Sequence, residues 1–86
     1  MSTVKKPILG ITMGDPFGNG PEISVRALAD ETVYDRCRPL VVGDAASMEY
    51  AAAVYNKLNG AAIRVHSVQS VQEAQFVAGT IDVLSL

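Results

Sequence analysis

A run of glycines and prolines at residues 11–23, with the sequence ITMGDPFGNGPEI, holds the groups of this chain best suited to ligand chemistry. Three glycines and two prolines fall between positions 14 and 21, with apolar sequence on both sides. Glycine permits the positive backbone angles of a tight turn and leaves neighbouring N–H groups uncovered. A helix that starts directly after such a turn adds free N–H groups of its own. The pattern fits a site for a negatively charged group and, equally well, a tight turn without a ligand.

Neither common phosphate-binding motif is complete in this run. The Rossmann fingerprint G-x-G-x-x-G fails because the six residues from Gly18 read GNGPEI and end in Ile23. A P-loop fails because no lysine follows Gly20. The physical ingredients of an anion site remain, since backbone N–H groups and a helix start meet at one turn.

Two polar side chains of the run have both a structural and a functional explanation. Asp15, between Gly14 and Pro16, is suited to an Asx-turn with the backbone ahead of it, and this is the interpretation we favour. The alternative is a hydrogen bond to a sugar hydroxyl or to a metal-bound water. Asn19 offers a donor and an acceptor between two glycines, which fits ligand contact and solvent exposure equally well.

Polar residues elsewhere favour structural roles. Asp44 follows an apolar strand, where an acid can bind a ribose hydroxyl in a dinucleotide fold, but a helix N-cap explains it more simply. His66 is the single histidine, so we interpret it as a partner-bonded or surface residue and not as a metal ligand. The single cysteine, Cys37, lies between two arginines that would favour a reactive thiolate, but we interpret it as a small buried apolar residue. No catalytic or metal-ligating residue is predicted within the chain.

Composition limits the classes of function. The chain has 86 residues, 49% of them hydrophobic, and a net charge of −2, which indicates a globular protein and not a disordered one. Its seven lysines and arginines are scattered, which argues against a nucleic-acid surface. No apolar run approaches the roughly 20 residues needed to cross a bilayer, and the apolar run near the N-terminus is too short and glycine-broken for a secretory signal. We therefore expect a cytoplasmic protein with no nucleic-acid and no membrane partner.

Apolar segments bounded by glycine or proline predict four strands. Two of them, at residues 7–13 and 39–42, are mostly apolar and are expected to be buried. The segment 63–68 alternates between polar and apolar residues, which is typical of a strand nearer the edge of a sheet. The segment 81–86 predicts a fourth strand.

Two helices are expected between these strands. The first covers residues 21–29, because Pro21 suits a first helical turn, and its apolar face is expected to carry Ile23, Ala27 and Leu28. The second follows Asp44 as N-cap and ends at Asn59-Gly60. Its apolar residues recur three and four apart and form a stripe of Met48, Ala51, Ala52, Tyr55 and Leu58. Residues 30–38 are polar and irregular with room for a short helical turn, and 70–78 predict a weak helix or a loop.

The succession of strands and helices predicts the fold class α/β, with a largely parallel sheet and flanking helices. The chain shows no internal repeat and no low-complexity linker. A complete domain seldom stops on an apolar strand, because the sheet edge would then be bare. We therefore expect residues 1–86 to be an N-terminal fragment of a longer protein.

The run GITMGDPFGNGPEI at residues 10–23 closely resembles the N-terminal signature of the 4-hydroxythreonine-4-phosphate dehydrogenase family, which acts in vitamin B6 synthesis. The segments PLVVGD at 39–44 and GTIDVL at 79–84 are similar to that family as well. The similarity covers most of this chain but only about the first quarter of a family member. A shorter form of the signature occurs in the isocitrate and isopropylmalate dehydrogenases, which resemble the family in fold.

The resemblance implies a homodimer of two-domain α/β subunits, of which residues 1–86 are the N-terminal part. It implies oxidation of a phosphorylated hydroxy acid by NAD, or by NADP, followed by loss of CO₂ from the keto product. A divalent metal (Zn, Mg or Co) acts as Lewis acid, and the three histidines that hold it lie beyond residue 86 in the family. By position, Gly18, Asn19 and Gly20 border the cleft where the dinucleotide binds. The segment by itself is then expected to be inactive.

Two residues depart from the family pattern. The family more often has a small residue in place of Phe17 and an aliphatic residue in place of Asn19. These departures fit a branch that acts on other four-carbon phosphorylated sugar acids, such as phospho-threonate or phospho-erythronate. Two alternatives stay open. One is a phosphate acyl- or acetyltransferase, which resembles the wider fold, and the other is a non-enzymatic nucleotide-binding module.

Overall fold

The protein forms a four-stranded sheet in which all described strand pairs are parallel. The computed structural model describes residues 6–12 and 20–85. The strand order is β1-β2-β4-β3, so the last strand in sequence lies between the second and the third. The strands are β1 (Ile8–Thr12), β2 (Arg38–Gly43), β3 (Arg64–Val68) and β4 (Thr80–Ser85). The predicted α/β class and the parallel sheet are confirmed, and β3 lies at an edge as its alternating sequence predicts.

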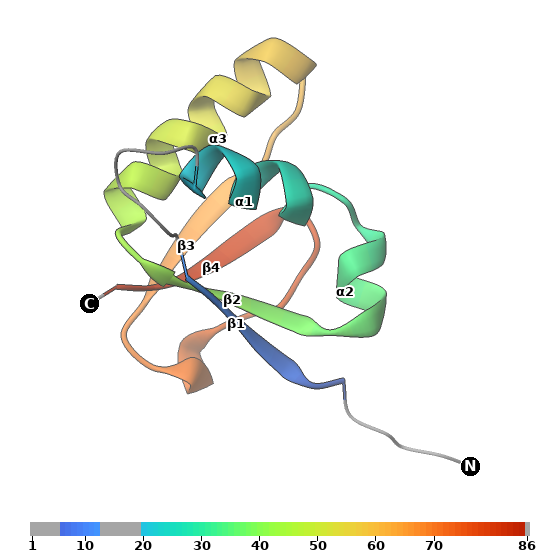
Figure 1. Ribbon diagram of the computed structural model, residues 1–86, viewed down its shortest axis with the longest axis vertical. Helices are drawn as coiled ribbons and strands as arrows, with labels where there is room; N and C mark the ends of the chain where they lie inside the picture. The colour runs from blue at the N-terminus through green and yellow to red at the C-terminus, as the bar shows by residue number, and fades with distance from the viewer. Residues whose placement is uncertain (1–5, 13–19, 86) are drawn as a thin grey trace.

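Two of the helices pack side by side on one face of the sheet (Figure 1). They are α1 (Gly20–Leu28) and α3 (Ala45–Asn59). A shorter helix, α2 (Thr32–Arg36), lies beside the start of β2, and a single 3-10 turn, η1 (Val71–Glu73), follows β3. The short helical turn expected within 30–38 is therefore present, and the segment 70–78 is mostly loop.

The hydrophobic core lies between the helix pair and the sheet. Its fully buried members come from both layers, with Val25 and Met48 on the helices and Val41, Ile81 and Val83 on the strands. Burying such side chains contributes about 1.5–3 kcal/mol each relative to leaving them exposed. The alternating residues of β2 and β4, Leu40 and Asp82, are buried as well but lie outside this core cluster, because successive side chains of a strand point to opposite faces.

Three helical residues predicted on apolar faces are exposed. Ile23 is 61% exposed, because α1 instead turns Ser24, Val25 and Leu28 inward. Leu58 is 77% exposed, because the last turn of α3 extends past the neighbouring helix and the strands (Figure 1). Ala27 on α1 is likewise exposed. The apolar stripe predicted on α3 is confirmed for its first three members, because Met48, Ala51 and Ala52 are buried.

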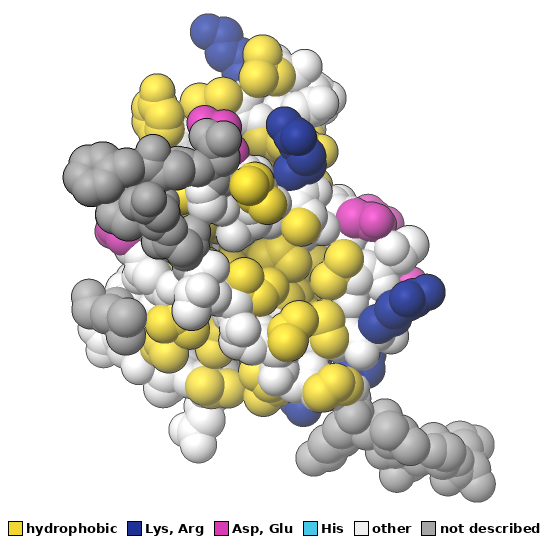
Figure 2. All heavy atoms as spheres, viewed as in Figure 1, with side chains coloured by type: hydrophobic (Ala, Val, Ile, Leu, Met, Phe, Trp, Pro, Cys, Tyr) yellow, Lys and Arg dark blue, Asp and Glu magenta, His cyan; other side chains and the backbone are white. Residues whose placement is uncertain are grey.

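The first strand is also less buried than its apolar sequence predicts. Ile8 and Leu9 are 43% and 51% exposed, whereas the neighbouring strand β2 buries Leu40 and Val41. The difference follows from position, because β1 is an edge of the described sheet and is paired on one side. On the face that carries α1 and α3, apolar atoms remain visible over the strands beside the helices (Figure 2).

The connection from β3 to β4 passes behind the sheet, away from α1 and α3 (Figure 1). The chain moves along the sheet from β1 to β2 and on to β3, and it then turns back to place β4 in between. Crossovers between parallel strands are right-handed, so a connection in the reverse direction has to use the opposite face. Residues 69–79 make this connection, with η1 near their start.

Candidate functional site

The carboxyl edge of the sheet is the candidate functional site. The strand ends there are Thr12, Gly43, Val68 and Ser85. The chain leaves β2 toward the face that carries α3, and it leaves β3 toward the opposite face. In open parallel sheets, ligands bind outside the carboxyl ends of the strands at the point where the connections diverge in this way. The end of β4 lies between the two diverging strands.

The start of α1 is the part of the glycine-rich run that the structure describes. Gly20 is the first residue of α1, and Pro21 lies in the first turn as predicted. Pro21 has no N–H to donate, so the free donors of the first turn are the N–H of Gly20 and the N–H groups that follow Pro21. Of the residues assigned to the dinucleotide cleft, Gly20 is thus placed at a helix start, and Gly18 and Asn19 lie outside the described residues, as do Asp15 and Phe17.

Asp44 caps α3 at the same edge of the sheet. Its Oδ1 accepts a hydrogen bond from Ala46 N at 3.2 Å, and its Oδ2 accepts one from Ser47 Oγ at 2.7 Å. These bonds, the one from Ser47 first, hold the pKa of the Asp44 carboxyl below its ordinary value. The predicted N-cap is confirmed. The carboxylate is ionised at neutral pH and engaged by α3, which makes it a fixed negative charge and not a proton carrier.

Two hydroxyl groups lie together at the ends of β3 and β4. Ser67 Oγ and Ser85 Oγ are 3.1 Å apart, and either can be the donor. Ser85 also pairs in register with Gly43 of β2, next to the Asp44 cap. The carboxyl edge therefore presents a helix start, one capped carboxylate and a hydroxyl pair, which are groups that bind and orient a polar ligand. The two serines were not singled out in the sequence because nothing in their spacing indicates that parallel pairing brings them together.

The amino edge of the sheet is occupied by structural contacts instead. Tyr34 donates a hydrogen bond from its hydroxyl to Thr80 O at 3.2 Å, and burial together with the nearby Asp82 carboxylate raises the pKa of Tyr34 to about 12. Lys6 Nζ donates to Tyr34 O at 2.6 Å. A phenol with so high a pKa remains protonated at neutral pH, so Tyr34 acts as a hydrogen-bond donor to the sheet.

His66 and Asp82 form a pair on the sheet face that points away from α1 and α3. The two residues are opposite each other in the register of β3 and β4, and His66 Nδ1 lies 2.9 Å from Asp82 Oδ1. The prediction of a partner-bonded histidine is confirmed. Asp82 was missed in the sequence, because an acid in an apolar strand gives no sign of the partners that the fold brings to it. Cys37 is half-buried, and its Sγ lies 3.5 Å from Val33 O.

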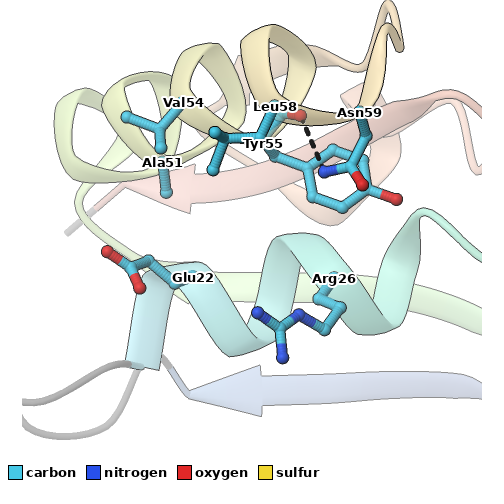
Figure 3. Close-up of a pocket in the computed structure, with 7 residues that line it drawn as sticks. All are labelled: Glu22, Arg26, Ala51, Val54, Tyr55, Leu58 and Asn59. Atoms are coloured by element: carbon cyan, nitrogen blue, oxygen red, sulfur yellow. Dashed lines mark hydrogen bonds between the residues drawn. The ribbon is translucent and has the colours of Figure 1, made fainter.

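A groove of about 300 Å³ lies between α1 and α3 (Figure 3). Glu22 and Arg26 of α1 point in different directions and do not converge on one position, and Asn59 donates to Tyr55 O at 2.9 Å. A small-molecule site needs a few convergent polar groups, so this groove is a weaker candidate than the carboxyl edge. Its lining residues are Glu22, Arg26, Ala51, Val54, Tyr55, Leu58 and Asn59.

The described residues do not supply a metal site. Within residues 6–12 and 20–85, no group of three or more histidine, cysteine, aspartate or glutamate side chains is placed to hold a metal ion. Among the same residues, no helix combines the length and the apolar character needed to cross a bilayer.

Similar proteins carry dehydrogenase names. D-threonate 4-phosphate dehydrogenase of Cupriavidus necator is 44% identical over 80 residues, which are 93% of this chain and 23% of that protein. 4-hydroxythreonine-4-phosphate dehydrogenase of Desulforapulum autotrophicum is 45% identical over 84 residues, which are 98% of this chain and 24% of that protein. No protein-family model matches the chain.

A solved structure agrees with these sequence matches. The crystal structure of a 4-hydroxythreonine-4-phosphate dehydrogenase from Burkholderia phymatum superposes with a TM-score of 0.83 and 41% identity, covering 96% of this chain and 24% of that one. The resemblance of this chain to the N-terminal segment of that family is confirmed. The chain spans about a quarter of the length of the relatives that it matches.

Proposed function

We propose that this chain is the N-terminal segment of a two-domain dehydrogenase that oxidises a phosphorylated four-carbon hydroxy acid with NAD or NADP. The observation that carries the proposal is the 44% identity, over 93% of the chain, to a protein named D-threonate 4-phosphate dehydrogenase. The parallel sheet supports it, because its carboxyl edge is where this architecture binds nucleotides. We further propose a cytoplasmic homodimer.

In the proposed reaction a secondary alcohol becomes a ketone. Its carbon-bound hydrogen leaves as hydride to the nicotinamide ring, and its hydroxyl proton passes to a base. In the resulting β-keto acid the bond to the carboxylate breaks, CO₂ leaves, and the electron pair forms an enolate that takes up a proton to give the ketone product. A divalent metal bound elsewhere in the complete protein would polarise the reacting oxygen. The described residues of this segment hold no such metal cluster, so their proposed contribution is to bind and orient.

The start of α1 and the preceding glycine-rich run are proposed to border the dinucleotide. The free N–H groups at the helix start suit a pyrophosphate, whose negative charge also interacts favourably with the positive helix end. Gly20 opens α1 at this point, and the proposal includes Gly18 and Asn19 directly before it. Asp44, fixed by its cap, places a negative charge beside the same edge and repels a misplaced phosphate.

The test is an assay of the protein encoded by the complete open reading frame. The purified protein is mixed with NAD and a divalent metal, and NADH formation is compared between D-threonate 4-phosphate and 4-hydroxythreonine 4-phosphate. We expect NADH and CO₂ with at least one of them, and none from a protein truncated after Leu86. Acyl transfer without NADH formation, or an open reading frame that ends at Leu86, would overturn the proposal.

A further inference from the structure

The connection between β3 and β4 is a strap, defined here as residues 69–79, that crosses the sheet face opposite α1 and α3. The side chains of its residues 69–73 are exposed, and it contributes no member to the buried core cluster. Segments with little apolar burial have low local stability unless specific polar contacts hold them. The strap therefore depends on its hydrogen bonds.

Several hydrogen bonds of the strap stay within it. Glu73 Oε2 accepts from Gln69 N at 3.2 Å and from Ser70 Oγ at 3.3 Å, and Ala74 N donates to Val71 O at 3.1 Å. These bonds shape the strap without attaching it to the sheet. At its end, Gly79 O accepts from Arg64 N at 2.9 Å, where the strap joins β4.

Asp82 attaches the middle of the strap to the sheet. This residue is 1% exposed, and its two carboxylate oxygens accept from Gln75 N at 3.1 Å each and from Phe76 N at 2.8 Å. On the sheet side, the same carboxylate is paired with His66 Nδ1 at 2.9 Å. Two successive backbone N–H groups that converge on one anion form a binding concavity of the kind found in phosphate sites, here filled by a side chain of the protein.

The backbone of the strap is strained where it meets this carboxylate. Phe76 has a φ of 53°, a left-handed conformation that is unfavourable for a non-glycine residue. The guanidinium of Arg38 lies 5.6 Å from the centre of the Phe76 ring and favours its position. Strained conformations of this kind persist where the surrounding contacts determine them.

We propose that the Asp82 carboxylate is a clasp that closes a releasable strap, so that residues 69–79 open as a unit while the four-stranded sheet stays folded. The carboxylate supplies the acceptors for two strap N–H groups and holds Phe76 in its left-handed conformation. Once the carboxylate is lost, the strain at Phe76 and the exposure of the strap both favour opening. The proposal is independent of the reaction that the complete protein performs.

The test compares two changes from acid to amide in the complete protein. Asp82→Asn removes the charge and turns an NH₂ group toward the strap donors, whereas Glu73→Gln makes the same chemical change in a carboxylate that bonds within the strap. Amide hydrogen exchange is measured at Gln75, Phe76, Val41 and Val83. In Asp82→Asn we expect about 10- to 100-fold faster exchange at Gln75 and Phe76, the range for losing hydrogen bonds to a charged group. Val41 and Val83 stay protected, and Glu73→Gln leaves all four close to the unaltered protein.

A second measurement on the unaltered protein covers the case in which Asp82→Asn does not fold. Exchange is followed in rising, sub-denaturing urea, where a local opening depends less on urea than global unfolding does. We expect Gln75 and Phe76 to exchange with a weaker urea dependence than Val41 and Val83. The proposal is overturned if all four amides share one urea dependence, or if a folded Asp82→Asn keeps Gln75 and Phe76 protected.

Discussion

Two substitutions on α3 separate the observed core from the core that helical periodicity predicts. Met48 and Leu58 both belong to the predicted apolar stripe, but Met48 is fully buried and Leu58 is 77% exposed. Met48→Ala removes an unbranched side chain and Leu58→Ala a γ-branched one, both from the same helix. The two variants therefore differ mainly in burial.

The expected losses differ by several-fold. Met48→Ala leaves a cavity between α3 and the sheet, and a buried Met→Ala change costs about 2–5 kcal/mol of unfolding free energy. Full burial of a leucine side chain is worth about 2 kcal/mol, so the small buried fraction of Leu58 gives a loss of about 0.5 kcal/mol. The slightly better helix propensity of alanine reduces that loss further.

Urea unfolding followed by far-ultraviolet circular dichroism measures both variants against the unaltered protein. Equal slopes of free energy against urea are needed for the comparison, because a changed slope signals a change in the surface exposed on unfolding. A loss in Leu58→Ala as large as that in Met48→Ala would refute the placement of the last turn of α3 outside the core. Small losses of unfolding free energy in both variants would refute the burial of Met48 in the core.

Three further substitutions test the helix caps and the buried phenol. Gly60→Ala is expected to lower the free energy of unfolding by about 1 kcal/mol, because φ is 63° at this C-cap although no atom obstructs a Cβ. Gly10→Ala serves as its control in urea unfolding, because Gly10 is equally unobstructed and has no positive φ. Tyr34→Phe removes the bond to Thr80 O and is expected to cost about 1 kcal/mol. Because the pKa of Tyr34 is raised from 10.0 to about 12, its contribution is complete below pH 10 and is lost as the pH rises toward 12, so the alkaline loss of stability should be smaller in Tyr34→Phe. Asp44→Ala should lower the melting temperature at neutral pH, because the cap is lost. The lowered pKa of the Asp44 carboxyl gives stability that is present above the unfolded pKa and is lost as the pH falls, so the variant should lose less stability in acid than the unaltered protein does. An equal loss of stability in acid would contradict the cap.

The elements that carry their own local signals were predictable from the sequence. Asp44 and Gly60 mark the ends of α3 by chemistry that acts within a few residues, and both caps are observed. The strands were predictable because short apolar segments bounded by glycine and proline are typical of strands in an α/β chain. The parallel sheet followed from their alternation with helices.

The predictions that failed concern features that depend on contacts between elements distant in sequence. The phase of α1 is one example, because Ile23 and Val25 both fit an apolar face in a nine-residue helix, and the core selects Val25. The exposure of β1 is another, since its residues are apolar but its place at the sheet edge is set by strand order. Asp82 is the clearest case, because its partners come from β3 and from a loop that only the crossover brings near.

The placement of the glycine-rich run was only partly predictable. Its sequence fits a ligand-binding turn and a plain tight turn equally well, and its described end, Gly20, lies at the start of α1. The hydroxyl pair of Ser67 and Ser85 depends on the parallel register of β3 with β4, which no local pattern encodes.

We propose that the carboxyl edge of this sheet borders a dinucleotide site. A crystal structure of the complete protein with bound NAD tests it most directly. We expect the pyrophosphate beside the start of α1, close to Gly20, and the dinucleotide outside the carboxyl ends of β1 and β2. A dinucleotide found in the groove between α1 and α3, or at the amino edge beside Tyr34, would contradict it.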